Sequence, residues 1–215
     1  MSKYLAHFIS FVFHPLFMMV YVLLILMRVN PFLFNIQSPE VGGLLIIRVV
    51  ITTVFFPIVA VALMKMLGLI QSVQMKTRVE RVGPLIVTGI FYIWMFLNIK
   101  NNDYFPEAFT YFVLGCTIAL FLAFFLNNFT KISLHGVGVG GILVASLIVY
   151  NLFSYNTFEL GSITFNSSVL VFGAVMITGL VATARLYLRE HTPDEVYGGI
   201  FIGGASQFIA YAIIF

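Results

Sequence analysis

Residues 108–127 read AFTYFVLGCTIALFLAFFLN and carry no charged side chain. A helix of this length rises about 30 Å, which matches the thickness of the hydrocarbon core of a bilayer. Similar apolar runs recur along the chain, and we predict spans at residues 5–27, 44–69, 83–99, 108–127, 136–153, 167–187 and 196–215. The sequence therefore predicts an all-α integral membrane protein, a bundle of about six to seven transmembrane helices.

The overall composition agrees with this fold class. Of 215 residues, 61% are hydrophobic and 9% are charged, whereas soluble domains carry about 25% charged residues. We therefore expect a single transmembrane helical domain over residues 1–215, surrounded by membrane lipids. The net charge of +3 is too small and too dispersed to predict binding of nucleic acid. Cys116 is the only cysteine, which excludes a disulfide within the chain.

Charged residues are distributed unequally between the two predicted membrane faces. When the spans alternate across the membrane, the N-terminus and the loops at 70–82, 128–135 and 188–195 share one face. That face collects most of the basic and histidine residues: Lys3, Lys65, Lys76, Arg78, Arg81, Lys131, His135, Arg185, Arg189 and His191. Two interpretations are open, a signal for the cytoplasmic side and a pocket for an anion. Arg185 favours the pocket, because a charge near the end of an apolar span is costly without a partner or ligand.

Three segments at this face, 76–84, 131–136 and 185–195, hold the residues that can do chemistry. Their arginines can bind phosphoryl oxygens through paired hydrogen bonds. A glycine-rich helix start follows Ser133 and His135, and free N–H groups at a helix start favour an anion. Of two histidines, one can attack phosphorus while the other protonates the leaving oxygen. These residue types together predict a site for a phosphate ester.

The third segment resembles the last signature of the type 2 phosphatidic acid phosphatase (PAP2) superfamily, Ser-Arg-x5-His-x3-Asp. Arg185, His191 and Glu195 keep its spacing, with glutamate in place of aspartate. Ser133-x-His135 resembles the Pro-Ser-Gly-His signature, and the segment 76–84 loosely resembles Lys-x6-Arg-Pro. The chain departs from these signatures at Ile132, Leu134 and Ala184, and Pro84 follows Arg81 at a distance of three residues.

The resemblance is strongest over residues 76–200 and implies a core of the PAP2/vanadium chloroperoxidase type. It implies a lipid phosphatase that uses no metal or other cofactor and forms a phosphohistidine. His191 is then the nucleophile, Glu195 orients it, and His135 is the general acid. The residues implied to bind the phosphoryl group are Arg185, Arg81, Lys76, Arg78 and Ser133.

The implied substrate is a phosphorylated lipid, such as an isoprenyl pyrophosphate, a phosphatidate-like lipid or a glycolipid phosphate. The resemblance also implies a bacterial inner (cytoplasmic) membrane, while the side of the site and the oligomeric state stay open. Three other interpretations of these residues stay open. They are a non-catalytic lipid-phosphate binding or transport protein on the same scaffold, a bundle whose charges only set topology, and a zinc site at His135, His191, Asp194 and Glu195.

Two further features predict how the helices are arranged. Small residues form one helix face at Gly136, Gly138, Gly140 and Gly141 and another at Gly198, Gly199, Gly203 and Gly204. Such faces predict close helix packing in lipid. The pair His14-Pro15 predicts an irregularity in the first span, with a pocket-lining histidine as the second interpretation.

Overall fold

The computed structural model describes the whole chain except Asn35, Gln37 and Lys76. Within the described residues, seven helical segments are long and apolar enough to cross a bilayer. They are Lys3–Val29, Pro39–Met66, Arg78–Ile99, Glu107–Leu126, Leu134–Phe153, Val169–Tyr187 and Pro193–Ile214. Each overlaps one predicted span, so the prediction of an all-α integral membrane bundle is confirmed.

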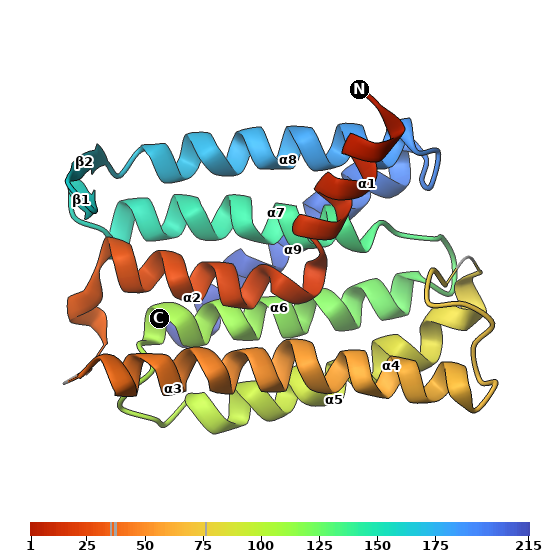
Figure 1. Ribbon diagram of the computed structural model, residues 1–215, viewed down its shortest axis with the longest axis horizontal. Helices are drawn as coiled ribbons and strands as arrows, with labels where there is room; N and C mark the ends of the chain where they lie inside the picture. The colour runs from red at the N-terminus through yellow and green to blue at the C-terminus, as the bar shows by residue number, and fades with distance from the viewer. Residues whose placement is uncertain (35, 37, 76) are drawn as a thin grey trace.

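The first two spans are interrupted helices. The first consists of α1 (Lys3–Val12), the short η1 (Pro15–Phe17) and α2 (Met18–Val29), and α1 crosses the bundle obliquely (Figure 1). The predicted irregularity at His14 is present, because His14 is extended with ψ 138° before the proline ring. The second span consists of α3 (Pro39–Val50), the π-helical turn η3 (Ile51–Phe55) and α4 (Phe56–Met66).

The remaining spans are α5 (Arg78–Ile99), α6 (Glu107–Leu126), α7 (Leu134–Ile148) with the π-helical turn η4 (Val149–Phe153), α8 (Val169–Tyr187) and α9 (Pro193–Ile214). The loops after α4, α6 and α8 gather with the N-terminus at one end of the bundle, on the right in Figure 1. This is the arrangement that alternating spans predicted. We call this end the basic end, after Lys3, Lys65, Arg78, Arg81, Lys131, Arg185 and Arg189.

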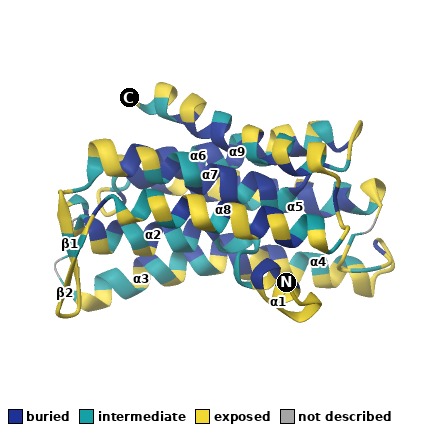
Figure 2. Cartoon of the chain, turned by 90° about the horizontal axis from the view of Figure 1, so that it is seen from above, coloured by how far each residue is buried: buried dark blue, intermediate teal, exposed yellow. Residues whose placement is uncertain are grey.

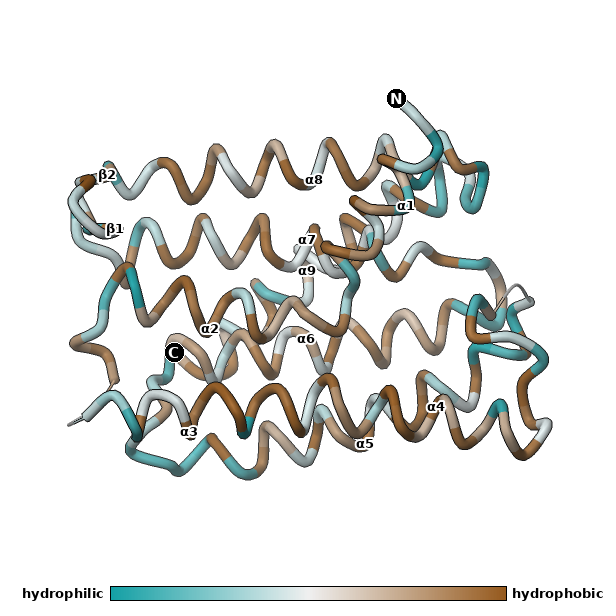
Figure 3. Tube along the Cα trace, in the orientation of Figure 1, coloured by the Kyte–Doolittle hydropathy of each residue, from teal (hydrophilic) through white to brown (hydrophobic). Residues whose placement is uncertain are grey.

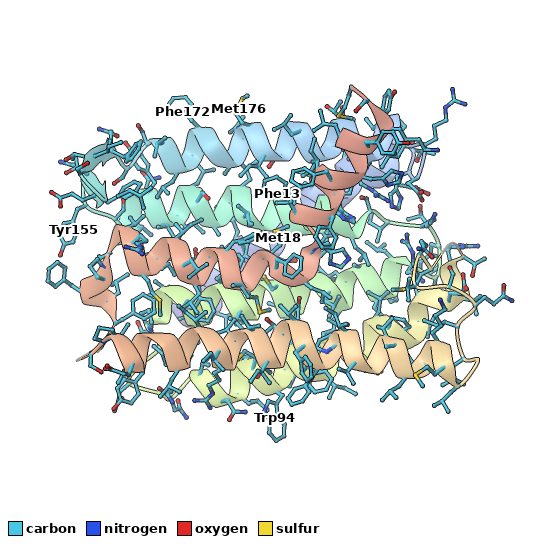
Figure 4. The ribbon with its side chains drawn as sticks, viewed as in Figure 1. Phe13, Met18, Trp94, Tyr155, Phe172 and Met176 are labelled. Atoms are coloured by element: carbon cyan, nitrogen blue, oxygen red, sulfur yellow. The ribbon has the colours of Figure 1, made fainter. Side chains whose placement is uncertain are left out.

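The opposite end carries η2 (Pro31–Leu33) and a small antiparallel hairpin, β1 (Thr157–Leu160) and β2 (Ile163–Asn166). Hydrophilic residues concentrate at the two ends, while the middle of the bundle is largely hydrophobic (Figure 3). Buried residues lie on the inner faces of the helices (Figure 2). Large apolar side chains such as Phe172, Met176 and Trp94 point outward and are more than half exposed (Figure 4), as expected where lipid replaces water.

Helices α7 and α9 approach each other through six of the eight glycines of the two predicted faces, whereas Gly138 faces Met18 and Pro15 and Gly198 faces Ile132. A Cβ atom added at Gly136 would lie 2.7 Å from the Val196 carbonyl oxygen, and one at Gly199 would lie 2.6 Å from that of Ser133. Larger residues would therefore separate the two helices. Since α7 begins directly after Ser133 and α9 begins directly after Thr192, this contact brings the second and third signature segments together.

Candidate functional site

A cavity of about 340 Å³ lies inside the basic end of the bundle. Its histidine and charged residues are His7, His14, Arg81, His135, Arg185, Glu190 and His191. Its lining farther into the bundle is mostly apolar and includes Met18, Leu85, Leu120 and Val137, with Tyr92 and Gln207. From Arg81 to Tyr92 the lining follows α5 over eleven residues, which corresponds to about 16 Å. The cavity thus has the polarity of an amphiphile, with charge at one end and apolar walls along its length.

His191 is held by Glu195. Its Nδ1 atom lies 2.8 Å from Oε2 of Glu195, and the side chain is almost completely buried. The same carboxylate oxygen accepts the N–H of Thr192, while the Thr192 hydroxyl accepts the N–H of Glu195. This reciprocal cap starts α9. Because Nδ1 is engaged, Nε2 is the nitrogen of His191 that is left for a ligand in the cavity.

The surroundings of His191 favour its neutral form. Burial lowers the pKa of this imidazole below its ordinary value, and the nearby charges of Arg81 and Arg185 lower it further. The hydrogen bond and charge of Glu195 act in the opposite direction. Since the sum is a lowered pKa, the ring carries an unprotonated nitrogen at neutral pH, which nucleophilic attack requires.

Ser133 connects the second signature segment to the third. Its backbone N–H donates to the carbonyl of Glu195 at 3.1 Å. Its hydroxyl accepts the N–H of Gly136 at 3.3 Å and so caps α7. The side chain is fully buried and is not part of the cavity lining. Ser133 therefore sits beside the predicted site with its hydroxyl engaged in a helix cap, where it can support the position of His135.

His135 projects from the first turn of α7 into the cavity and meets the N-terminal span there. Its Nε2 atom lies 2.9 Å from the carbonyl oxygen of Ser10. The ring of His14 packs against it edge-on, with centroids 5.3 Å apart. His14 thus has the pocket-lining position that was the second interpretation of this residue. Ser10 belongs to none of the three signature segments, although His7, Ser10 and His14 have the 3 and 4 residue spacing of one helix face.

Two arginines extend guanidinium groups toward the cavity. Arg81 donates from one terminal nitrogen to the Ile132 carbonyl at 2.9 Å and from Nε to the Met75 carbonyl at 3.3 Å. Arg185 donates to the Ser10 hydroxyl at 3.4 Å, and its other terminal nitrogen lies 3.9 Å from a carboxylate oxygen of Glu190. No hydrogen-bond partner of the buried Arg185 Nε occurs within the described part of the chain. Both arginines keep N–H groups with which they can bind an anion.

The structure does not bring every predicted ligand to the cavity. Arg78 is exposed and donates to the carbonyls of Asn128 and Phe129 at 3.0 and 2.7 Å, so the structure does not bring it to the cavity. Lys76 lies outside the described residues. Glu80, two residues after Arg78, accepts N–H groups of Gln71, Ser72 and Thr77 and thereby ties the loop before α5 to that helix.

Comparison with family models, with curated proteins and with solved structures finds no match for this chain. Among the residues that the structure describes, no group of three or more His, Cys, Asp or Glu side chains is arranged to hold a metal ion. The zinc interpretation of His135, His191, Asp194 and Glu195 therefore lacks a ligand set there. What the cavity offers is a neutral histidine backed by a carboxylate, a second histidine and two guanidinium groups.

Proposed function

We propose that this protein is a metal-independent membrane lipid phosphatase of the PAP2 type. The observation that supports this proposal most is that His191, buried and bonded to Glu195, shares one cavity with Arg81, Arg185 and His135. The apolar walls beyond these residues suit the chain of a lipid whose phosphate lies among the charges. We propose a bacterial inner membrane as its compartment, as the resemblance to that superfamily implies.

The proposed reaction has two steps. In the first, Nε2 of His191 attacks phosphorus, the bond from phosphorus to the leaving oxygen breaks, and that oxygen takes a proton from His135. In the second, a water molecule attacks the phosphohistidine and gives its proton to His135, and the phosphorus–nitrogen bond breaks to release phosphate. By this route, a phosphomonoester and water give an alcohol and inorganic phosphate. A lipid pyrophosphate and water give the lipid monophosphate and inorganic phosphate.

The two arginines have a defined task in this reaction. The phosphoryl group carries negative charge that spreads over its equatorial oxygens as the leaving oxygen departs. Guanidinium groups that are held in advance by Ile132, Met75 and Ser10 need little reorganisation to bind those oxygens. Glu195 stabilises the positive charge that forms on His191 when it is phosphorylated, as a triad carboxylate does.

The decisive experiment is phosphate release by purified protein in detergent or liposomes. The panel contains isoprenyl pyrophosphates, phosphatidate and lysophosphatidate, each with wild type and His191→Ala, and each with and without EDTA. We expect release that withstands EDTA and is lost in His191→Ala. Release by both proteins, or release that EDTA abolishes, would contradict the mechanism.

The same assay separates the proposal from non-catalytic binding or transport. Folded protein that binds these lipids without releasing phosphate would favour a binding protein. The interrupted first span lines the cavity, a feature that transporter sites share, but transporter sites generally lie near the midplane. The concentration of charge at one end of this cavity therefore argues against transport. Folded protein that binds no phosphate even at low salt would leave the charges with a topological role.

A further inference from the structure

We propose that the last turn of α1 is a positioning element of the site, with the Ser10 carbonyl holding His135 as its Nε2–H tautomer and leaving Nδ1 to carry the transferred proton. This inference rests on the proposed function, because it concerns the nitrogen through which His135 protonates the leaving oxygen. It adds a part of the chain that lies outside the three signature segments. Ser10 and His135 are separated by 125 residues and meet only through the packing of the bundle.

The acceptor for His135 exists because the first span is broken. In an uninterrupted helix the His14 N–H would donate to the Ser10 carbonyl. Pro15 has no N–H for the Phe11 carbonyl, and the His14 N–H donates to Phe11 at 3.3 Å instead. The Ser10 carbonyl is thereby released and takes the Nε2–H of His135 at 2.9 Å.

The tautomer follows from the chemistry of this contact. A carbonyl oxygen only accepts, so Nε2 of His135 must carry the hydrogen. In the neutral ring Nδ1 then has the lone pair, and in the imidazolium Nδ1 holds the proton that can be given away. His191 has the opposite arrangement, since its Nδ1–H donates to Glu195 and its Nε2 then keeps the lone pair. The two histidines would therefore act through different ring nitrogens.

Other contacts of this turn and of the break that follows it keep this geometry in place. The Ser10 hydroxyl is within 3.4 Å of a terminal nitrogen of Arg185, so one residue contacts both the candidate acid and a candidate phosphate ligand. Ser10 is buried. The His14 ring, whose Nδ1 accepts the N–H of Leu16, packs on His135 at an interplanar angle of 87°. The neighbouring Val12 carbonyl accepts the Tyr21 hydroxyl at 2.6 Å.

The test measures the tautomer directly. Protein labelled with 15N-histidine is studied in detergent by NMR, and the signals of His135 are assigned by their loss in His135→Gln. We expect the Nε2–H tautomer in wild type and in Ser10→Ala, which keeps the carbonyl. In Pro15→Ala the His14 N–H can return to Ser10, and we expect a mixture of tautomers. Tyr21→Phe removes a bond at the same break without touching His135 and is the matched control, with an unchanged tautomer.

Activity supplies the second measurement. General acid catalysis matters most when the leaving oxygen is basic. The activity of Pro15→Ala should therefore fall by more than about tenfold with lysophosphatidate and by less than about threefold with p-nitrophenyl phosphate. Tyr21→Phe should show no such difference between the two esters. A Nδ1–H tautomer of His135 in wild type, or equal losses on both esters in Pro15→Ala, would overturn the inference while phosphate release still stood. The expected tautomers without any phosphate release would instead refute the proposed function, and with it the proton-transfer role of Nδ1, while the positioning of His135 by Ser10 still stood.

Discussion

Nδ1 of His191 lies 2.8 Å from Oε2 of Glu195, and this same oxygen accepts the backbone N–H of Thr192 at 3.2 Å. One carboxylate therefore joins the start of α9 to the imidazole that we propose as nucleophile. Because the cap forms only when the helix begins at Pro193, the position of the helix start and the orientation of the ring are determined together.

The carboxylate of Glu195 can be tested apart from its role in the cap. Glu195→Gln retains a side chain that is accepted at this cap position, but it removes the charge that stabilises phosphorylated His191 in the proposed mechanism. We expect a loss of about 10²- to 10⁴-fold in kcat with little change in thermal stability. The matched control is Asp194→Asn, an exposed neighbour in the same turn, which should retain activity. Equal activities of the two variants would remove Glu195 from the mechanism.

The pKa of His191 depends on its burial and on neighbouring charges that act in opposite directions. Burial lowers the pKa of this residue, Glu195 raises it and Arg81 lowers it, so its midpoint should lie below 6.5. Glu195→Gln should move the midpoint farther down, and Arg81→Gln should move it up. NMR titration of labelled histidine measures the His191 midpoint in wild type and in each of the two variants. Shifts of the same sign in the two variants would contradict this electrostatic assignment.

The lowered pKa of His191 also predicts the direction in which stability changes with pH. Between the folded-state pKa and 6.5, the unfolded chain binds more protons at His191 than the folded protein does. Its contribution to stability is therefore fully present above about pH 6.5 and is lost as the pH falls through the folded-state value. The thermal unfolding temperature in detergent should therefore fall less on acidification in His191→Gln than in wild type.

Arg81 and Arg78 can be compared directly, because they lie one turn apart on α5 and their side chains contact different parts of the protein. Arg81 lines the cavity, whereas Arg78 bonds to the loop after α6. Loss of a charged hydrogen-bond donor to a phosphoryl group costs about 1.5–3 kcal/mol, so Arg81→Ala should raise KM about 10- to 100-fold. Arg78→Ala should change KM little. A comparable rise in both would show that Arg78 also reaches the substrate.

The glycine contact between α7 and α9 should be sensitive to a single methyl group. A Cβ atom at Gly140 would overlap the Ile200 carbonyl, so Gly140→Ala should destabilise the protein by about 1–3 kcal/mol and lower activity by moving His135 relative to His191. Gly173 on α8 has no heavy atom within 4 Å of an added Cβ. Gly173→Ala should therefore keep activity and full stability. Thermal unfolding of both variants in detergent measures the difference.

The sequence alone was sufficient for features that depend on local patterns. Apolar runs of membrane-spanning length predicted the seven spans, and alternation of those spans predicted the end of the bundle at which His135 and His191 both lie. The relation between His191 and Glu195 is also local, because a histidine directly before a capping threonine is close to the third residue of the helix. The spacing of Arg185, His191 and Glu195 was therefore informative without knowledge of any distant contact.

Only the tertiary structure decided which residues of that end meet. Arg78 and Arg81 are equivalent in a pattern of charges, yet the loop after α6 offers carbonyls to one, while the cavity receives the other. The contact of His135 with Ser10 joins residues 125 positions apart, and its acceptor is a backbone carbonyl that every residue possesses. Hydrophobic periodicity and helix caps are determined by neighbours in the chain, whereas the partner of a side chain depends on how the helices pack. For this reason the membrane fold and the charged end were predictable from the residues, and the tautomer of His135 was not.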